Sequence, residues 1–136
     1  MISAVDTRVL LDVMIADARF GRASAELLRS ALAQGSVVAC DVVWAEIAGQ
    51  FAGTDEARLA LAALGVEYSA TPADTALAAG TAWREYRRRG GTRERVIADF
   101  LIGAHAFGRA DRLLTRDRGF YRTYFRGLEV VAPTSS

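Results

Sequence analysis

The stretch ISAVDTRVLLDVM, residues 2–14, decides the fold class, because its pattern returns along the whole chain. Ile2–Val5 is a short apolar run, which predicts a first strand. Asp6 or Thr7 can cap a helix that runs to about Ala16. A strand that leads directly into a helix is the repeating unit of α/β proteins.

Short apolar runs and helical patterns alternate through the rest of the sequence. The runs predict strands at residues 36–40, 66–69, 112–115 and 128–131. Helical patterns occupy residues 22–34, 41–51, 54–64, 72–88 and 95–107. Asp41 is placed to be an N-cap, and a turn is expected at Arg118 and Gly119. We therefore expect an α/β domain with a mainly parallel sheet.

Size and composition favour one soluble domain. A chain of 136 residues, 51% of them hydrophobic, is large enough for a single core. The one cysteine, Cys40, cannot form an internal disulfide, which suits a reducing cytoplasm. The first six residues lack the basic segment of a signal peptide, and no uncharged apolar run approaches the ~18 residues that span a bilayer. We expect a cytoplasmic protein without a membrane segment.

All seventeen basic residues are arginine. The absence of lysine excludes P-loop and Schiff-base chemistry, both of which need a lysine amine. The net charge of +1 is unevenly distributed, since residues 1–83 carry five arginines and ten acids and residues 84–126 carry twelve arginines and five acids. This asymmetry is compatible with a polyanionic partner and equally with a solvated helical face.

Four acids stand in apolar surroundings or directly after a predicted strand: Asp6, Glu46, Asp99 and Asp117. An ionised carboxylate near a core costs several kcal/mol unless arginine, backbone N–H groups or a cation compensates it. Ligands of open α/β sheets bind at the carboxyl ends of the strands, where these acids are expected. Oxygen ligands of this kind suit Mg²⁺ or Mn²⁺.

Each of the four acids also has a simpler explanation. Asp6 fits a helix N-cap, and Asp117 fits a turn. Glu46 and Asp99 can each pair with one of the many arginines. Taken singly, none of these residues identifies a site, so the argument rests on their order and their neighbours.

With these acids in order, nearly the whole chain resembles the PIN-domain nucleases, and within them the VapC-like toxins of bacterial toxin–antitoxin pairs. The resemblance is carried by VDTRVLLD (residues 5–12), VVWAEI (42–47), ADFLIGAHA (98–106) and LLTRDRGF (113–120). It implies a three-layer α/β/α domain over residues 1–133 with a C-terminal tail at 134–136. The family usually has Asn or Ser where this chain has Arg8, and this departure puts metal affinity in doubt.

The resemblance also implies a function. It points to a Mg²⁺- or Mn²⁺-dependent endoribonuclease, a homodimer and a VapB-like antitoxin partner. Asp6 and Asp99 would be the main ligands, Glu46 would complete the shell or orient water, and Asp117 would support it. Thr115 and Arg8 would lie behind or beside these ligands. An RNA-processing nuclease and a catalytically impaired binding protein are the alternatives.

Other residues have open roles at this stage. RNA contacts are expected at Arg93, Arg95, Arg116 and Arg118, within clusters that also hold Arg84, Arg87, Arg88, Arg89 and Arg122. Phe120, Tyr121, Tyr124 and Phe125 fit core packing better than base stacking, and Trp44 and Trp83 fit the core or a dimer interface. His105 is expected to be structural. Asp12 is expected on the surface or behind the ligands.

Overall fold

The computed structural model describes residues 1–134 and contains one sheet of five parallel strands in the order β3-β2-β1-β4-β5. The strands are β1 (Ile2–Val5), β2 (Ser36–Cys40), β3 (Val66–Ser69), β4 (Arg112–Leu114) and β5 (Glu129–Val131). The expected α/β class with a mainly parallel sheet is therefore confirmed, and every pairing in the described chain is parallel.

The central strand β1 lies between β2 and β4. Ile2 pairs with Ser36 on one side, and Ser3 pairs with Arg112 on the other. The chain proceeds outward from β1 to β2 and β3, then returns past β1 to reach β4 and β5. The direction of winding thus reverses between β1 and β4, and such a switch point opens a crevice at the carboxyl ends of the two strands.

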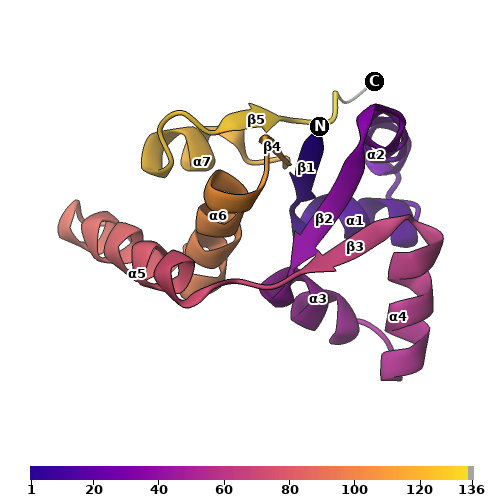
Figure 1. Ribbon diagram of the computed structural model, residues 1–136, viewed down its shortest axis with the longest axis horizontal. Helices are drawn as coiled ribbons and strands as arrows, with labels where there is room; N and C mark the ends of the chain where they lie inside the picture. The colour runs from indigo at the N-terminus through magenta and orange to yellow at the C-terminus, as the bar shows by residue number, and fades with distance from the viewer. Residues whose placement is uncertain (135–136) are drawn as a thin grey trace.

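Seven helices connect the strands of the described chain. They are α1 (Thr7–Met14), α2 (Gly21–Gln34), α3 (Asp41–Ala48), α4 (Thr54–Ala63), α5 (Ala73–Arg88), α6 (Ile97–Arg109) and α7 (Arg118–Tyr124). Figure 1 shows α2 and α4 on one side of the sheet and α5 and α6 on the other. This arrangement is the expected three-layer α/β/α architecture.

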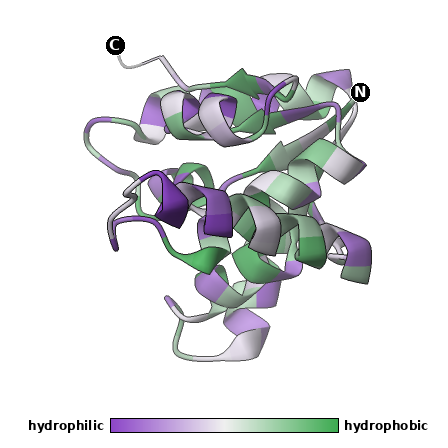
Figure 2. Ribbon diagram, turned by 90° about the vertical axis from the view of Figure 1, so that its left-hand side faces the viewer, coloured by the Kyte–Doolittle hydropathy of each residue, from purple (hydrophilic) through white to green (hydrophobic). Residues whose placement is uncertain are grey.

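The core lies on both faces of the sheet. Val5, Val37 and Leu113 are fully buried strand residues, and Leu10 and Phe100 reach them from the helices. Burying one such side chain contributes roughly 1.5–3 kcal/mol. Figure 2 shows the strands largely in hydrophobic colours, with the hydrophilic residues concentrated on the outer helix turns and loops. Covering on both faces explains why the strands are continuous apolar runs rather than alternating ones.

The turn expected at Arg118 and Gly119 is wrong, because these residues begin helix α7. A glycine and several aromatic residues make this segment a poor helix by propensity. Its stability comes from packing instead, since Phe120 and Tyr121 are buried against the core. Tertiary burial therefore overrides local preference here.

The expected N-cap at Asp41 is also wrong, by one position. Cys40 occupies the N-cap, and Asp41 is the first residue of α3. The Asp41 carboxylate accepts a hydrogen bond from the Thr71 hydroxyl, so it joins two chain segments rather than capping its own helix. A carboxylate in the first turn still favours the positive end of the helix dipole.

The C-terminal tail and the possibility of a membrane-spanning helix remain to be compared with the structure. Of the expected tail at residues 134–136, only Thr134 lies within the described residues. In residues 1–134, no helix combines the length and the apolar character needed to cross a bilayer.

Candidate active site

The four predicted acids meet at one cleft of about 330 Å³. Asp6, Glu46, Asp99 and Asp117 all line it, together with Arg8, Arg95 and Arg116. Asp6 follows β1 and Asp117 follows β4, whereas Glu46 belongs to α3 and Asp99 to α6. The cleft therefore lies at the switch point, and residues 111 positions apart in the sequence share it. A larger, mostly apolar cleft of about 660 Å³ beside α5 and α6 contains none of these four acids.

Asp6 occupies the N-cap position of α1 but does not cap the helix with its side chain. Its carboxylate oxygen Oδ2 instead accepts a hydrogen bond of 2.7 Å from the hydroxyl of Thr115, a fully buried residue. The backbone N–H of Asp6 bonds to the carbonyl of Leu114, which extends the β1–β4 pairing to the end of the strand. The simple capping explanation for Asp6 therefore does not hold.

Glu46 is an exposed residue of α3 whose carboxylate is held by the neighbouring helix α1. The hydroxyl of Thr7 donates a 2.6 Å hydrogen bond to Glu46 Oε1. No site role is predicted for Thr7 from the sequence, although Thr7 directly follows Asp6. Two threonines, Thr7 and Thr115, thus orient two of the four carboxylates.

Asp99 stands in the first turn of α6. Its Oδ2 accepts a hydrogen bond of 3.2 Å from the backbone N–H of Val96, at the N-cap of the same helix. Burial raises the pKa of Asp99, while this N–H and the Arg95 guanidinium lower it and Asp117 raises it. No arginine forms an ion pair with Asp99 or Glu46 in the described chain, so the expected simple pairing does not explain these two acids.

Asp117 is different, because it forms a close ion pair with Arg95. Arg95 also lies over the ring of Phe120, 4.3 Å from its centroid. Asp117 is the N-cap residue of α7 and makes no capping hydrogen bond with its side chain. Arg95, which is predicted to contact RNA, is therefore paired with Asp117, which is predicted to be a site acid.

The electrostatics of the cleft show how closely the acids share space. The pKa of Asp6 is raised to about 6, mainly by burial and further by the charges of Asp99 and Glu46. The hydrogen bonds from Thr115 and from the Thr7 backbone lower it in part. Like charges that raise the pKa of a buried acid mark a place where a cation is favourable.

The donor set suits a divalent ion in kind, because hard cations prefer carboxylate oxygens. Within residues 1–134, however, no three His, Cys, Asp or Glu side chains stand together as a group that could enclose an ion. The reason is visible in the contacts above. Each of the four carboxylates is turned toward a protein donor, namely Thr115, Thr7, the Val96 N–H or Arg95.

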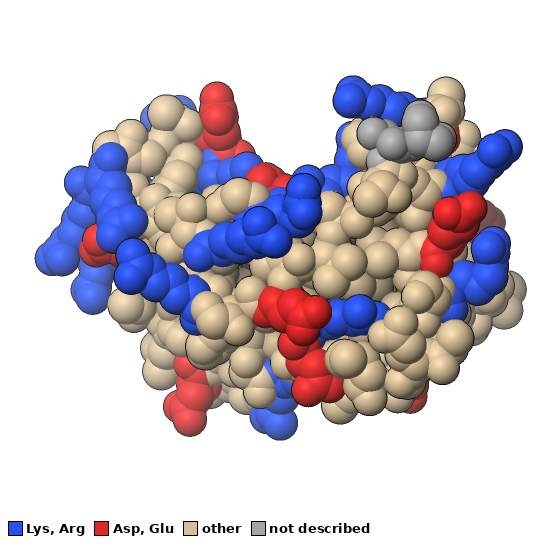
Figure 3. Space-filling view, turned by 90° about the horizontal axis from the view of Figure 1, so that it is seen from above, with Lys and Arg blue, Asp and Glu red and all other residues tan. Residues whose placement is uncertain are grey.

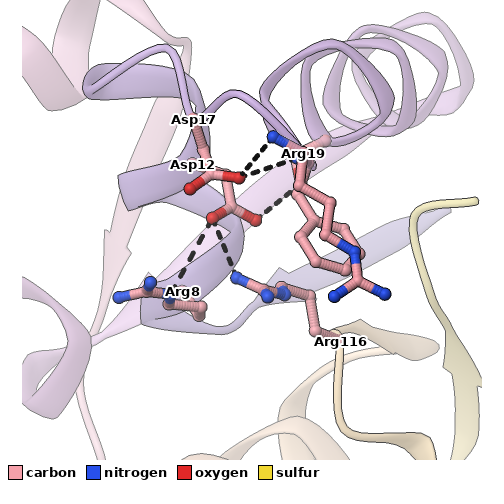
Figure 4. Close-up of polar contacts among 7 residues, drawn as sticks. Arg8, Asp12, Asp17, Arg19 and Arg116 are labelled. Carbon is pink, nitrogen blue, oxygen red and sulfur yellow. Dashed lines mark hydrogen bonds and ion pairs between the residues drawn. The ribbon is translucent and has the colours of Figure 1, made fainter. Parts of the chain in front are cut away.

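Asp12 is buried, so the expectation that it might lie on the surface is wrong. Its Oδ1 lies 3.1 Å from Arg116 Nη1 and 3.8 Å from Arg8 Nε. Its Oδ2 accepts a 3.0 Å hydrogen bond from Ser24. Figure 4 shows Arg8 and Arg116 converging on this one carboxylate from different parts of the chain. The signal for this residue was an acid within the apolar segment of residues 9–14.

The remaining predicted RNA contacts lie outside the acidic cleft. Arg118 is an exposed residue at the start of α7. Arg93 lines a neighbouring cleft of about 500 Å³ with Trp83 and Arg87, and Arg95 borders both clefts. Figure 3 shows blue arginine side chains gathered at the end of the molecule formed by α5. The arginine clusters at 84–95 therefore cover the end of α5 and the loop that follows it.

The aromatic residues pack as expected. Phe120, Tyr121 and Phe125 are buried, and Phe120 makes edge contacts with Phe100 and Tyr121. Trp44 meets the edge of Tyr68, and Trp83 carries the guanidinium of Arg87 over its ring at 4.4 Å. These contacts assign the cluster at residues 120–125 to the core.

His105 is a buried residue of α6 that does not line the acidic cleft. Its Nε2 lies 2.8 Å from the hydroxyl of Ser69, and burial lowers its pKa. A neutral, hydrogen-bonded imidazole in the core is the structural histidine that the sequence predicted.

Comparisons with known proteins identify the family and the fold. Residues 4–126 match the PIN domain family. Comparison with curated proteins gave no significant sequence match.

Several solved structures share the fold. VapBC2 from Rickettsia felis, bound to a promoter DNA fragment, aligns with a TM-score of 0.73 and 16% identity over 97% of this chain and 98% of that chain. VapBC-1 from nontypeable Haemophilus influenzae gives 0.71 and 17% over 97% and 98%. FitAcB from Neisseria gonorrhoeae gives 0.67 and 18% over 98% of both chains. At these identities the likeness establishes the fold.

Proposed function

This chain belongs to the PIN domain family, and from that premise we propose that it is a Mg²⁺- or Mn²⁺-dependent endoribonuclease and the toxin of a toxin–antitoxin pair. PIN domains are typically nucleases, and those nucleases generally use divalent metal ions. The proposal is supported most by one observation. Four carboxylates from four separate elements line a single cleft at the switch point of the sheet.

The site residues divide by what surrounds them. Asp6, Asp99 and Glu46 would hold the ion, since none of them is neutralised by an arginine. Asp117 would assist from the far side of the cleft, where Arg95 already pairs with it. A divalent ion supplies a water of lowered pKa and offsets negative charge on the phosphate.

The protein itself contributes orientation. Thr115 and Thr7 hold the carboxylates of Asp6 and Glu46 in fixed directions by hydrogen bonds. Such preorganisation matters because a ligand or base misplaced by about 1 Å can cost a hundredfold in rate. Arg8, Arg95 and Arg116 supply positive charge at the rim, where a phosphate backbone would pass.

The toxin assignment rests on the neighbours in fold. The solved relatives are toxin–antitoxin complexes named VapBC and FitAB, and some are bound to DNA. By analogy we propose a VapB-like antitoxin as the partner and a homodimer as the assembly. The test begins with a search for a short reading frame beside this gene. We expect its product to copurify with this chain and to restore growth when the two are coexpressed, and the absence of such a partner would count against the toxin assignment.

RNA cleavage by the purified protein is the direct test of the activity. We expect wild type to cut a structured RNA with Mg²⁺ or Mn²⁺ and not in EDTA. Asp6→Asn and Asp99→Asn should each lower the rate by at least a hundredfold, because each removes a charged ligand that the metal requires. The matched control is Asp55→Asn on α4, an acid with a 93% exposed side chain, which should cut like wild type.

Two results would contradict the proposal. One is an absence of RNA cleavage by the folded wild type with either metal. The other is cleavage by Asp6→Asn and Asp99→Asn at the wild-type rate, which would show that any activity comes from a contaminant or from another site.

A further inference from the structure

Next to the acidic cleft, Arg8 and Arg116 form ion pairs with a buried carboxylate, that of Asp12. The proposed function gives this carboxylate no part in metal binding or catalysis. Asp12 is 0% exposed, and one of its oxygens faces both guanidinium groups. The side chain of Arg116 is 27% exposed and that of Arg8 is 56% exposed. Both guanidinium groups lie beside this carboxylate (Figure 4), and both side chains are partly open to solvent and line the cleft.

A second contact fixes Arg116. Its guanidinium carbon lies 3.6 Å from the centroid of the Phe20 ring. Phe20 is held in turn by Asp17, which accepts hydrogen bonds from the backbone N–H groups of Phe20 at 2.7 Å and Arg19 at 3.1 Å. A stacked and ion-paired arginine loses little further freedom when it binds a ligand.

The position of these two arginines relative to the site acids is unexpected. Arg8 and Arg116 line the same cleft as four carboxylates, yet within residues 1–134 neither forms an ion pair with any of them. Asp12 thus lies between two cations beside the acidic cleft. It can balance only one of the two charges, and the Asp17 carboxylate also interacts with both arginines.

We infer that Arg8 and Arg116 form a binding subsite for a backbone phosphate of the RNA, and that Asp12 is the positioning residue of this subsite. The inference rests on the proposed ribonuclease function. It adds the place at which the protein binds the RNA strand beside the cleavage site. Guanidinium groups suit this ligand because their planar N–H donors match phosphate oxygens in pairs. The ligand class is a phosphodiester chain, independent of its sequence.

If Asp12 is a positioning residue, its substitution should weaken RNA binding, whereas the change in net charge alone would strengthen it. Asp12→Asn removes a negative charge beside the cleft, so overall electrostatics would tighten the binding of RNA. If Asp12 holds Arg116 and Arg8 away from the site acids, the same substitution lets them turn toward those acids, and RNA binding weakens. The sign of the change therefore separates the two explanations.

The experiment measures the affinity of the purified full chain for a fluorescein-labelled single-stranded RNA of 20 nucleotides at several salt concentrations in EDTA, where the RNA stays intact. We expect Arg116→Gln to raise Kd about tenfold and to lower the slope of log Kd against log salt by ~0.7, the loss of one phosphate contact. Asp12→Asn should raise Kd about as much as Arg116→Gln does. When Asp12→Asn is added to Arg116→Gln, it should raise Kd little further, because Asp12 acts mainly through Arg116.

Controls keep the outcome interpretable. Arg58→Gln, on α4 outside the cleft, removes one positive charge from a 73% exposed side chain and should leave Kd within twofold. Thermal melting checks that each variant folds. Should Asp12→Asn not fold, Arg116→Lys retains the charge but cannot stack or span both partners, and we expect it to raise Kd several-fold.

Three results would overturn the inference while the proposed function stands. The first is that folded Asp12→Asn binds RNA as tightly as wild type or more tightly. The second is that Asp12→Asn raises Kd as much in the Arg116→Gln background as in wild type, and the third is that Arg116→Lys binds RNA with wild-type affinity. If the wild type itself neither binds nor cuts RNA, the proposed ribonuclease function fails and the inference fails with it.

Discussion

Thr115 and Asp6 form the contact on which the geometry of the cleft depends. Thr115 is fully buried, donates to the Asp6 carboxylate and accepts a hydrogen bond of 3.1 Å from the backbone N–H of Asp117. It therefore links the carboxylate of the acid that follows β1 to the backbone of the N-cap residue of α7. A single hydroxyl thus orients the Asp6 side chain and holds the chain at Asp117, two candidate site residues that are far apart in the sequence.

The state of Asp6 depends on pH. Its pKa is about 6 in the folded protein, against an ordinary value of 3.8, mainly because it is buried and to a smaller extent because of the charges of Asp99 and Glu46. Between these two values the folded chain binds a proton that the unfolded chain has released. By linkage, this group adds stability to the metal-free protein as pH falls through 6, and the gain is complete near pH 4.

The corresponding prediction compares wild type with Asp6→Asn in EDTA. At pH 7.5 we expect Asp6→Asn to be the more stable protein in urea denaturation, because it carries no buried charge at this position. The difference should shrink as the pH is lowered from 7 toward 5. His105, whose lowered pKa acts in the opposite direction, is present in both proteins and cancels in the comparison. A difference that is constant with pH would contradict the raised pKa.

At the scale of elements, three consecutive residues after β4 each contact a charged residue from another segment beside the cleft. Thr115 bonds to Asp6, Arg116 to Asp12, and Asp117 pairs with Arg95. This segment therefore connects the end of β1, helix α1 and the loop before α6. Its position beside the switch point explains why a short linker can reach all three.

The sequence predicted the strands and most helices because they rely on local patterns of apolar residues. The order of the four acids and the residues beside them, which carry the family resemblance, also predicted which acids line the cleft, although each acid taken singly has a simpler explanation. The local patterns missed α7, whose stability depends on the burial of Phe120 and Tyr121 rather than on propensity. Tertiary contacts of this kind are not encoded in any single window of sequence.

Asp12 and Thr7 show the same limit within the site. The sequence predicts Asp12 on the surface or behind the ligands, but it does not show that the partners of Asp12 are Arg116 and Ser24, which come from other segments. Thr7 gained its role through Glu46, which lies 39 positions away in the sequence. Side-chain partners across elements become visible only when the elements are packed.

Packing between α6 and α7 gives a prediction at this scale. Gly103 in α6 faces the ring of buried Phe125, and a Cβ at this position would collide with the ring carbon Cε2. We expect Gly103→Ala to lower the free energy of unfolding by about 1–3 kcal/mol, although alanine is the better helix former. Urea denaturation measures this change.

The matched control for Gly103→Ala is Gly80→Ala in the interior of α5. A Cβ there would have no atom within 4 Å, so helix propensity alone should act. We expect a gain of roughly 0.5–1 kcal/mol from this substitution. Equal effects of the two substitutions would show that Phe125 moves aside at little cost.

At the scale of the whole molecule, the fold brings negative charge to one place and surrounds it with arginine. Asp6, Glu46 and Arg8 reach the cleft from the amino-terminal half. Asp99, Asp117, Arg95 and Arg116 reach it from the arginine-rich half. The switch point of the sheet thus brings charges of both signs from both halves together, and the net charge of +1 does not show this local concentration.

The last prediction follows from this concentration of charge. A divalent ion that binds the folded cleft and not the unfolded chain stabilises the protein by about 2.7 kcal/mol at a hundredfold excess over its Kd. We therefore expect millimolar Mg²⁺ or Mn²⁺ to raise Tm by several degrees above the value in NaCl of equal ionic strength, which corrects for screening. Asp6→Asn and Asp99→Asn should lose most of this rise, whereas Asp55→Asn should keep it. An equal Tm in metal and in NaCl would show that the carboxylates, each held by a protein donor, do not rearrange to share an ion.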